Sequence, residues 1–173
     1  SRTRRSSSRM VAVEAACSHP EGVRLAQSLL EPDQPTIRRV VEDRGFRHVG
    51  DLRYMRRDWE PVPPASEDRP LPDGVTLHNW NEVDDQAFMR ALERTYIDTL
   101  DCPTLCGMRR IEDVLESHRG AGVWRPELWW LIRDKGRPEG AVLINEFPDQ
   151  GHAELVYLGL GPRLRGQGLS ATV

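Results

Sequence analysis

Three runs of apolar residues in the second half of the chain predict neighbouring strands. They cover residues 128–133, 140–146 and 153–160, and each is rich in leucine, valine, isoleucine or aromatic side chains. Two short segments of turn-forming residues, 134–138 and 147–151, join them. Because strands linked by short turns pair with each other, this pattern predicts a three-stranded antiparallel meander.

Apolar residues at helical spacing precede these strands. Phe88 and Leu92 belong to one such repeat, and Val114 and His118 belong to a second. A spacing of three or four residues places apolar side chains on one face of a helix, so two amphipathic helices are predicted. An alternating run at residues 75–80 predicts a further strand before them. The predicted order is therefore strand, helix, helix and three strands.

The first part of the chain follows a different order. Residues 10–17 have a helical composition without a breaker, which predicts the end of a helix. Residues 23–30 fit a strand or a helical turn, because their short period matches both. A helix is predicted from Pro35, which suits a first helical position, to a stop at Gly45. A strand is predicted within residues 46–57.

A proline-rich segment, residues 58–74, divides the chain. Its composition predicts an extended linker between residues 1–57 and residues 75–173. The chain begins at Ser1 instead of a methionine and ends at Val173, within a predicted helix start. From these ends we expect a fragment of a longer protein.

Composition restricts the class of protein. The 173 residues are 38% hydrophobic and 29% charged, a balance typical of a globular protein. A net charge of −3 argues against a nucleic-acid partner, although arginines within residues 2–9 keep that alternative open. No apolar stretch approaches the roughly 20 residues that span a bilayer, so no membrane partner is expected. Three cysteines are too few for a disulfide framework, which predicts a cytoplasmic protein.

The segment from Glu154 to Ser170 carries the strongest chemical signal. A predicted strand leads into a loop that contains Arg165, Gly166 and Gly168, and a helix is predicted to begin where the loop ends. Glycines allow the backbone to approach a ligand and to point N–H groups into one concavity. A helix N-terminus adds partial positive charge, so the segment predicts a phosphate or pyrophosphate site.

These residues resemble the acetyl-CoA signature of the GCN5-related N-acetyltransferases. The signature is a strand followed by P-x-x-R-G-x-G, then leucine or isoleucine and a small residue. The matching positions are Pro162, Arg165, Gly166, Gly168, Leu169 and Ser170. In the form R-x-x-G-x-G/A, Arg165 and Gly168 fit, and Ser170 replaces the final small residue. The predicted helix pair and meander also suit that fold.

A second resemblance concerns the first part of the chain. Domains of this family end with a strand, a helix closing in Gly-Phe and a final strand, and Gly45 and Phe46 occupy the place of that pair. The expected fold class is α/β, of the α+β type with a mixed sheet. Residues 1–57 would be the C-terminal half of one acetyltransferase repeat, and residues 75–173 the N-terminal half of a second. This arrangement resembles the tandem-repeat branch that includes mycothiol synthase.

The resemblance implies an acetyl transfer from acetyl-CoA to the amine of a small molecule by direct attack. Glu154 is the expected general base, on the assumption that regular alternation places it on one face with Leu158 and Leu160. The pantetheine arm would bond to main-chain groups of the strand, and the pyrophosphate to the loop. The expected cofactor residues are Leu158, Gly159, Leu160, Arg163, Arg165, Gly166, Gln167, Gly168, Leu169 and Ser170.

The loop that joins the two predicted helices borders the acceptor site in this family. Tyr96, Asp98 and Asp101 are therefore candidates to contact a cationic amine. Cys102 and Cys106 lack the second pair of ligands that a zinc site needs, so no metal is expected. The alternative function is a non-catalytic, CoA-binding or structural repeat. The sequence does not indicate an oligomeric state.

Overall fold

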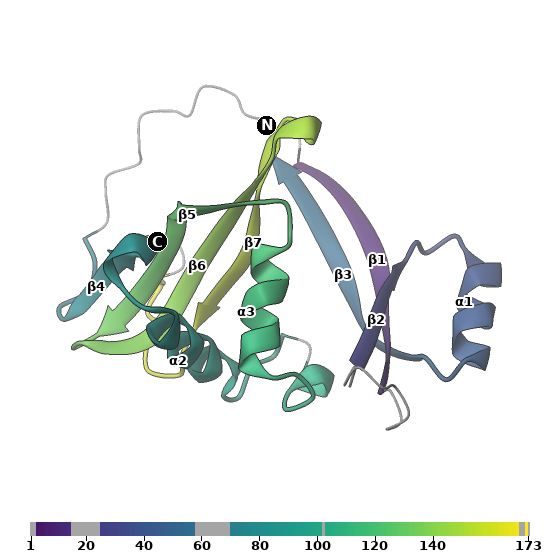
Figure 1. The fold of residues 1–173 in the computed structure, drawn as a ribbon, viewed down its shortest axis with the longest axis horizontal. Coiled ribbons are helices and arrows are strands. Elements are labelled where there is room, and N and C mark those ends of the chain that lie inside the picture. Colours follow the sequence, from purple (N-terminus) through teal and green to yellow (C-terminus); the bar gives the residue numbers. More distant parts are fainter. Residues whose placement is uncertain (1–2, 15–24, 58–69, 102, 170–171, 173) are drawn as a thin grey trace. The chain divides into compact units, whose positions relative to one another are not determined.

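The computed structural model describes residues 3–14, 25–57, 70–101, 103–169 and 172 (Figure 1). The chain divides into two compact units. Unit 1 comprises Ser1–Ser66 together with Asp101–Arg109, and unit 2 comprises Glu67–Leu100 together with Arg110–Val173. None of the described helices is both long enough and apolar enough to cross a membrane.

Unit 1 contains one antiparallel sheet with the strand order β2-β1-β3. Its elements are β1 (Thr3–Glu14), β2 (Leu25–Leu30), α1 (Pro35–Asp43) and β3 (Arg47–Arg57). The strand alternative for β2 is confirmed, as are the predicted helix and final strand. Leu105, from the short 3-10 turn Pro103–Leu105, is buried in this unit against a small apolar group, which comprises Leu25, Val49, Leu52 and Met108.

The helix predicted at residues 10–17 is wrong for residues 10–14, which lie in β1. Residues 15–17 lie outside the described part of the chain. The valines at positions 11 and 13 are β-branched and favour extended backbone. β1 pairs with β2 on one side and with β3 on the other, and these hydrogen-bond partners favour a strand. The composition of residues 10–17 alone gives no information about them.

Unit 2 contains an antiparallel sheet with the strand order β4-β5-β6-β7. Its strands are β4 (Val75–Asn79), β5 (Val123–Asp134), β6 (Arg137–Phe147) and β7 (His152–Leu160). Between β4 and β5 lie a 3-10 turn (Trp80–Glu82), α2 (Asp85–Tyr96) and α3 (Ile111–Arg119), and a second 3-10 turn (Pro148–Gln150) precedes β7. The predicted element order and the meander are confirmed, and the unit is a mixed α/β structure.

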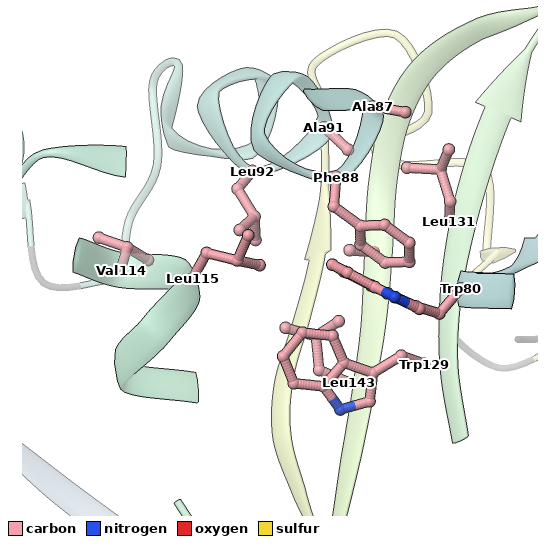
Figure 2. Close-up of a cluster of buried hydrophobic side chains, with 11 residues drawn as sticks. Trp80, Ala87, Phe88, Ala91, Leu92, Val114, Leu115, Trp129, Leu131 and Leu143 are labelled. Atoms are coloured by element: carbon pink, nitrogen blue, oxygen red, sulfur yellow. The ribbon is translucent and has the colours of Figure 1, made fainter. Parts of the chain in front are cut away.

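Helices α2 and α3 cover one face of this sheet (Figure 1). The core between them is aromatic: the rings of Trp80 and Phe88 lie 4.4 Å apart, and Trp129 contacts Trp80 edge-on at 5.4 Å (Figure 2). Trp129 is fully buried, whereas the adjacent Trp130 is 38% exposed. Successive side chains of a strand point to opposite faces, as the sequence predicted for this pair.

Asn145 is a fully buried polar residue on β6. Its Oδ1 accepts a hydrogen bond from Trp129 Nε1 at 2.8 Å. Its Nδ2 donates to the carbonyl oxygens of His118, at 2.6 Å, and Ala121, at 2.5 Å. The side chain therefore joins the sheet to the C-terminal end of α3 and supplies a donor to carbonyl oxygens there.

Candidate functional site

The loop that follows β7 is held to unit 2 by an apolar cluster and an ion pair. Leu164 and Leu169 are buried in a second apolar cluster with Ile132 and Val142. Arg163 Nε lies 2.9 Å from Asp134 Oδ2, at the end of β5. These anchors fix the start and the end of the loop and leave residues 165–168 between them.

Gly166 and Gly168 both have left-handed backbone conformations, with φ of 74° and 72°. A Cβ built at either position would meet no atom within 4 Å, so steric crowding does not explain these glycines. The intervening Arg165 and Gln167 do not have positive φ. Backbone that alternates in this way turns successive N–H groups toward a common point and forms a nest for an anion.

The amides of this turn are open to a ligand. Among the described residues, the backbone N–H groups of Arg165, Gly166 and Gly168 make no hydrogen bond to a backbone acceptor. The side chain of Gln167 folds back and donates to the carbonyl oxygen of Arg163 at 2.7 Å. Gly168 is exposed, so the turn presents its peptide groups at the surface of unit 2.

Arg165 is part of the scaffold of this turn. Its guanidinium donates to four main-chain carbonyl oxygens, those of Leu160, Thr95, Ile97 and Asp98. The sequence analysis includes Arg165 among the expected cofactor residues. In the structure its Nε and both terminal nitrogens bind protein instead.

The C-terminal end of β7 offers main-chain groups for an added strand. Gly161 N donates to Glu139 O at 2.6 Å, and the register places Leu160 opposite Gly140. In an antiparallel pair, hydrogen-bonded and non-hydrogen-bonded pairs alternate. The peptide groups of Leu158 and Leu160 therefore point away from β6, while those of Gly159 point toward it. Among the described strands, β7 pairs with β6 alone.

A bulge in β7 changes the face on which Glu154 lies. Tyr157 is opposite Leu143 and Leu155 is opposite Ile144, so Val156 is the extra residue. Val156 and Tyr157 consequently both pack toward the helix-side core. Glu154 lies opposite Asn145, whose side chain contacts the end of α3. The expectation that Glu154 shares a face with Leu158 and Leu160 is wrong.

The acceptor candidates are distributed over both units. Tyr96 lies against Tyr157 with ring centroids 6.2 Å apart, and Asp98 is exposed next to α2 with a positive φ of 50°. Asp101 belongs to unit 1. Ser170, the last residue of the expected cofactor site, lies outside the described residues.

The sequence reasoning missed an apolar hollow on the sheet face opposite α2 and α3. It has a volume of about 390 Å³ and is lined by Leu77, Trp130, Val142, Ile144, Leu155, Leu158 and Thr172. The only sequence signal for it is the pair of adjacent tryptophans, of which one must leave the helix-side core.

In the part of the chain that the structure describes, no group of three or more His, Cys, Asp and Glu side chains is placed to hold a metal ion. Cys106 is a free, exposed thiol, and Cys102 lies outside the described residues. Comparison with protein-family models and with curated proteins finds no match for the chain.

Proposed function

We propose that unit 2 binds acetyl-CoA at the turn after β7 and transfers the acetyl group to an amine, as part of a GCN5-related N-acetyltransferase domain. The observation that carries this proposal is the turn of residues 165–168. Its open amides and alternating backbone suit a pyrophosphate, and they follow directly on a strand whose outward peptide groups suit an extended arm. The element order from β4 to β7 is also the order that the resemblance implies.

The chemistry assigned to this chain has two parts. The N–H of Leu158 points away from β6, as that of Leu160 does, and is the nearer of the two to Glu154; it would donate to the carbonyl oxygen of the thioester as negative charge develops there. Glu154 would accept the proton of the attacking amine, directly or through a water, from the helix side of the sheet. The amine nitrogen bonds to the acetyl carbon, the carbon–sulfur bond breaks, and CoA leaves as the thiol.

Titration of the 173-residue protein with CoA in a calorimeter tests the binding step. Uptake of CoA is expected, and uptake that is lost when the turn is altered would locate the site. Absence of uptake by the intact chain would contradict the proposal. Uptake without acetyl transfer to any member of a panel of primary amines would instead support the non-catalytic alternative.

Replacing Glu154 with glutamine is expected to lower kcat/KM for acetyl transfer at least about 100-fold and to leave the affinity for CoA unchanged. The substitution keeps the shape of the side chain and removes its ability to accept a proton, which general bases contribute at roughly this magnitude. Free thiol released from acetyl-CoA measures the rate. Glu127→Gln, at an exposed position on β5, is the matched control. Full activity of E154Q would assign the proton transfer to another group.

A further inference from the structure

The C-terminal end of α2 depends on a side chain from the loop after β7. The last carbonyl groups of a helix have no partner within the helix. Arg165 supplies donors for carbonyl groups at this end of α2. Its Nη2 donates to Thr95 O at 2.8 Å, and its Nη1 donates to Ile97 O at 2.8 Å and to Asp98 O at 3.1 Å. A cation at this end also complements the helix dipole. The contact acts as a cap from a residue distant in sequence.

The same guanidinium also holds the strand. Its Nε donates to Leu160 O at 2.8 Å, so one planar group binds α2, the segment after it and the end of β7. Arginine has five N–H donors in a fixed fork, whereas lysine is a compact point charge that cannot reach all four oxygens at once. The position of this turn relative to α2 therefore depends on the shape of the side chain as well as on its charge.

A second connection joins the same two elements. The hydroxyl groups of Tyr157 and Thr95 lie 2.5 Å apart, and Thr95 Oγ1 donates to Leu92 O at 2.6 Å. Thr95 is thus tied to β7 through its side chain and to the turn through its carbonyl oxygen. Beyond Thr95 the restraint weakens: the N–H groups of Ile97 and Thr99 make long hydrogen bonds of 3.3 and 3.4 Å.

We infer that Arg165 is a positioning residue that couples occupancy of the turn at residues 165–168 to the order of the segment Tyr96–Asp98. The inference rests on the proposed function, because it takes CoA as the occupant of the turn. A ligand that immobilises the turn also immobilises the guanidinium, which in turn fixes the carbonyl groups of Ile97 and Asp98. Asp98 has a positive φ of 50°, a sparsely populated conformation, and the hydrogen bond from Arg165 to its carbonyl oxygen helps to hold it. The turn and the candidate acceptor segment then respond as one unit.

Amide hydrogen exchange with CoA as the probe tests this coupling. In the unaltered protein, saturating CoA is expected to slow exchange at residues 165–168 and, at least about threefold, at the N–H groups of Ile97 and Thr99. In Arg165→Lys, CoA at a concentration that saturates the variant is still expected to slow exchange at residues 165–168. The slower exchange at Ile97 and Thr99 is expected to disappear. Arg125→Lys is the matched control: Arg125 lies on β5, outside the turn and α2, and pairs with Glu146 at 2.8 Å, so this variant is expected to keep both effects.

The outcomes separate this inference from the proposed function. If CoA is not taken up by the unaltered protein, both are overturned. If CoA binds and protects residues 165–168 but not Ile97 and Thr99, the inference alone is overturned, and this result needs no variant to fold. Equal protection of Ile97 and Thr99 in Arg165→Lys would also overturn it, because the fork of the arginine would then not carry the coupling.

Discussion

Replacing Gly168 with alanine is expected to weaken CoA binding about tenfold. The turn needs the left-handed conformation at this residue, with φ of 72°, and that conformation costs an alanine roughly 1–2 kcal/mol. The free variant relaxes away from the nest, so binding has to restore the strained backbone. Since 1.4 kcal/mol corresponds to a factor of ten in affinity, the dissociation constant measured by calorimetry is expected to rise by about that factor.

Gly151 provides the control for backbone strain. It has φ of 65° in the turn before β7, and a Cβ there also meets no atom within 4 Å. Gly151→Ala should therefore lower stability by an amount similar to Gly168→Ala while the affinity for CoA stays unchanged. If both variants lose affinity equally, the loss reflects general destabilisation and the turn is not the CoA site.

Replacing Asn145 with alanine is expected to lower the free energy of unfolding of unit 2 by about 3 kcal/mol. The side chain makes three hydrogen bonds in a fully buried position. Its removal leaves Trp129 Nε1 and Ala121 O without these partners and takes one of its donors from His118 O, and each unsatisfied buried group costs about 1–3 kcal/mol before relaxation or water entry. Urea unfolding followed by tryptophan fluorescence measures the change.

Asn81→Ala serves as the comparison for this substitution. Asn81 is exposed, and its side-chain Nδ2 donates to the neighbouring Asn79 Oδ1 at 3.0 Å. Exposed substitutions of this kind usually change stability by less than about 0.5 kcal/mol. Similar losses in the two variants would mean that Asn145 acts through helix or strand preference and not through its buried hydrogen bonds.

The elements of unit 2 were predictable because each depends on a local pattern. Phe88 and Leu92 share the buried face of α2, and their spacing in the sequence already indicated this. The opposite faces of Trp129 and Trp130 follow from the two-residue period of a strand. The position of the glycine turn after β7 was likewise local, since Gly166 and Gly168 mark backbone conformations that other residues avoid.

The strand at residues 10–14 and the role of Arg165 depend on contacts between residues that are distant in the sequence. The chain at residues 10–14 has a helical composition, yet two partner strands place it in β1. The role of Arg165 required the position of Thr95, which lies 70 residues earlier in the chain. The sequence identified Arg165 as a cation near an anion site, and only the fold shows that its donors are already committed to carbonyl groups.

The extra residue in β7 has a consequence for how this strand tolerates length changes. Because Val156 is an extra residue, the side chains before it alternate between the two faces of the sheet in the opposite phase to those after it. Deleting a single codon here would restore uniform parity and exchange the sides of every upstream side chain in the strand. Glu154 would then lie on the face of the sheet that carries the apolar hollow, and Leu155 would lie on the face that the helices cover. One inserted amino acid thus decides which surface of the sheet carries the carboxylate.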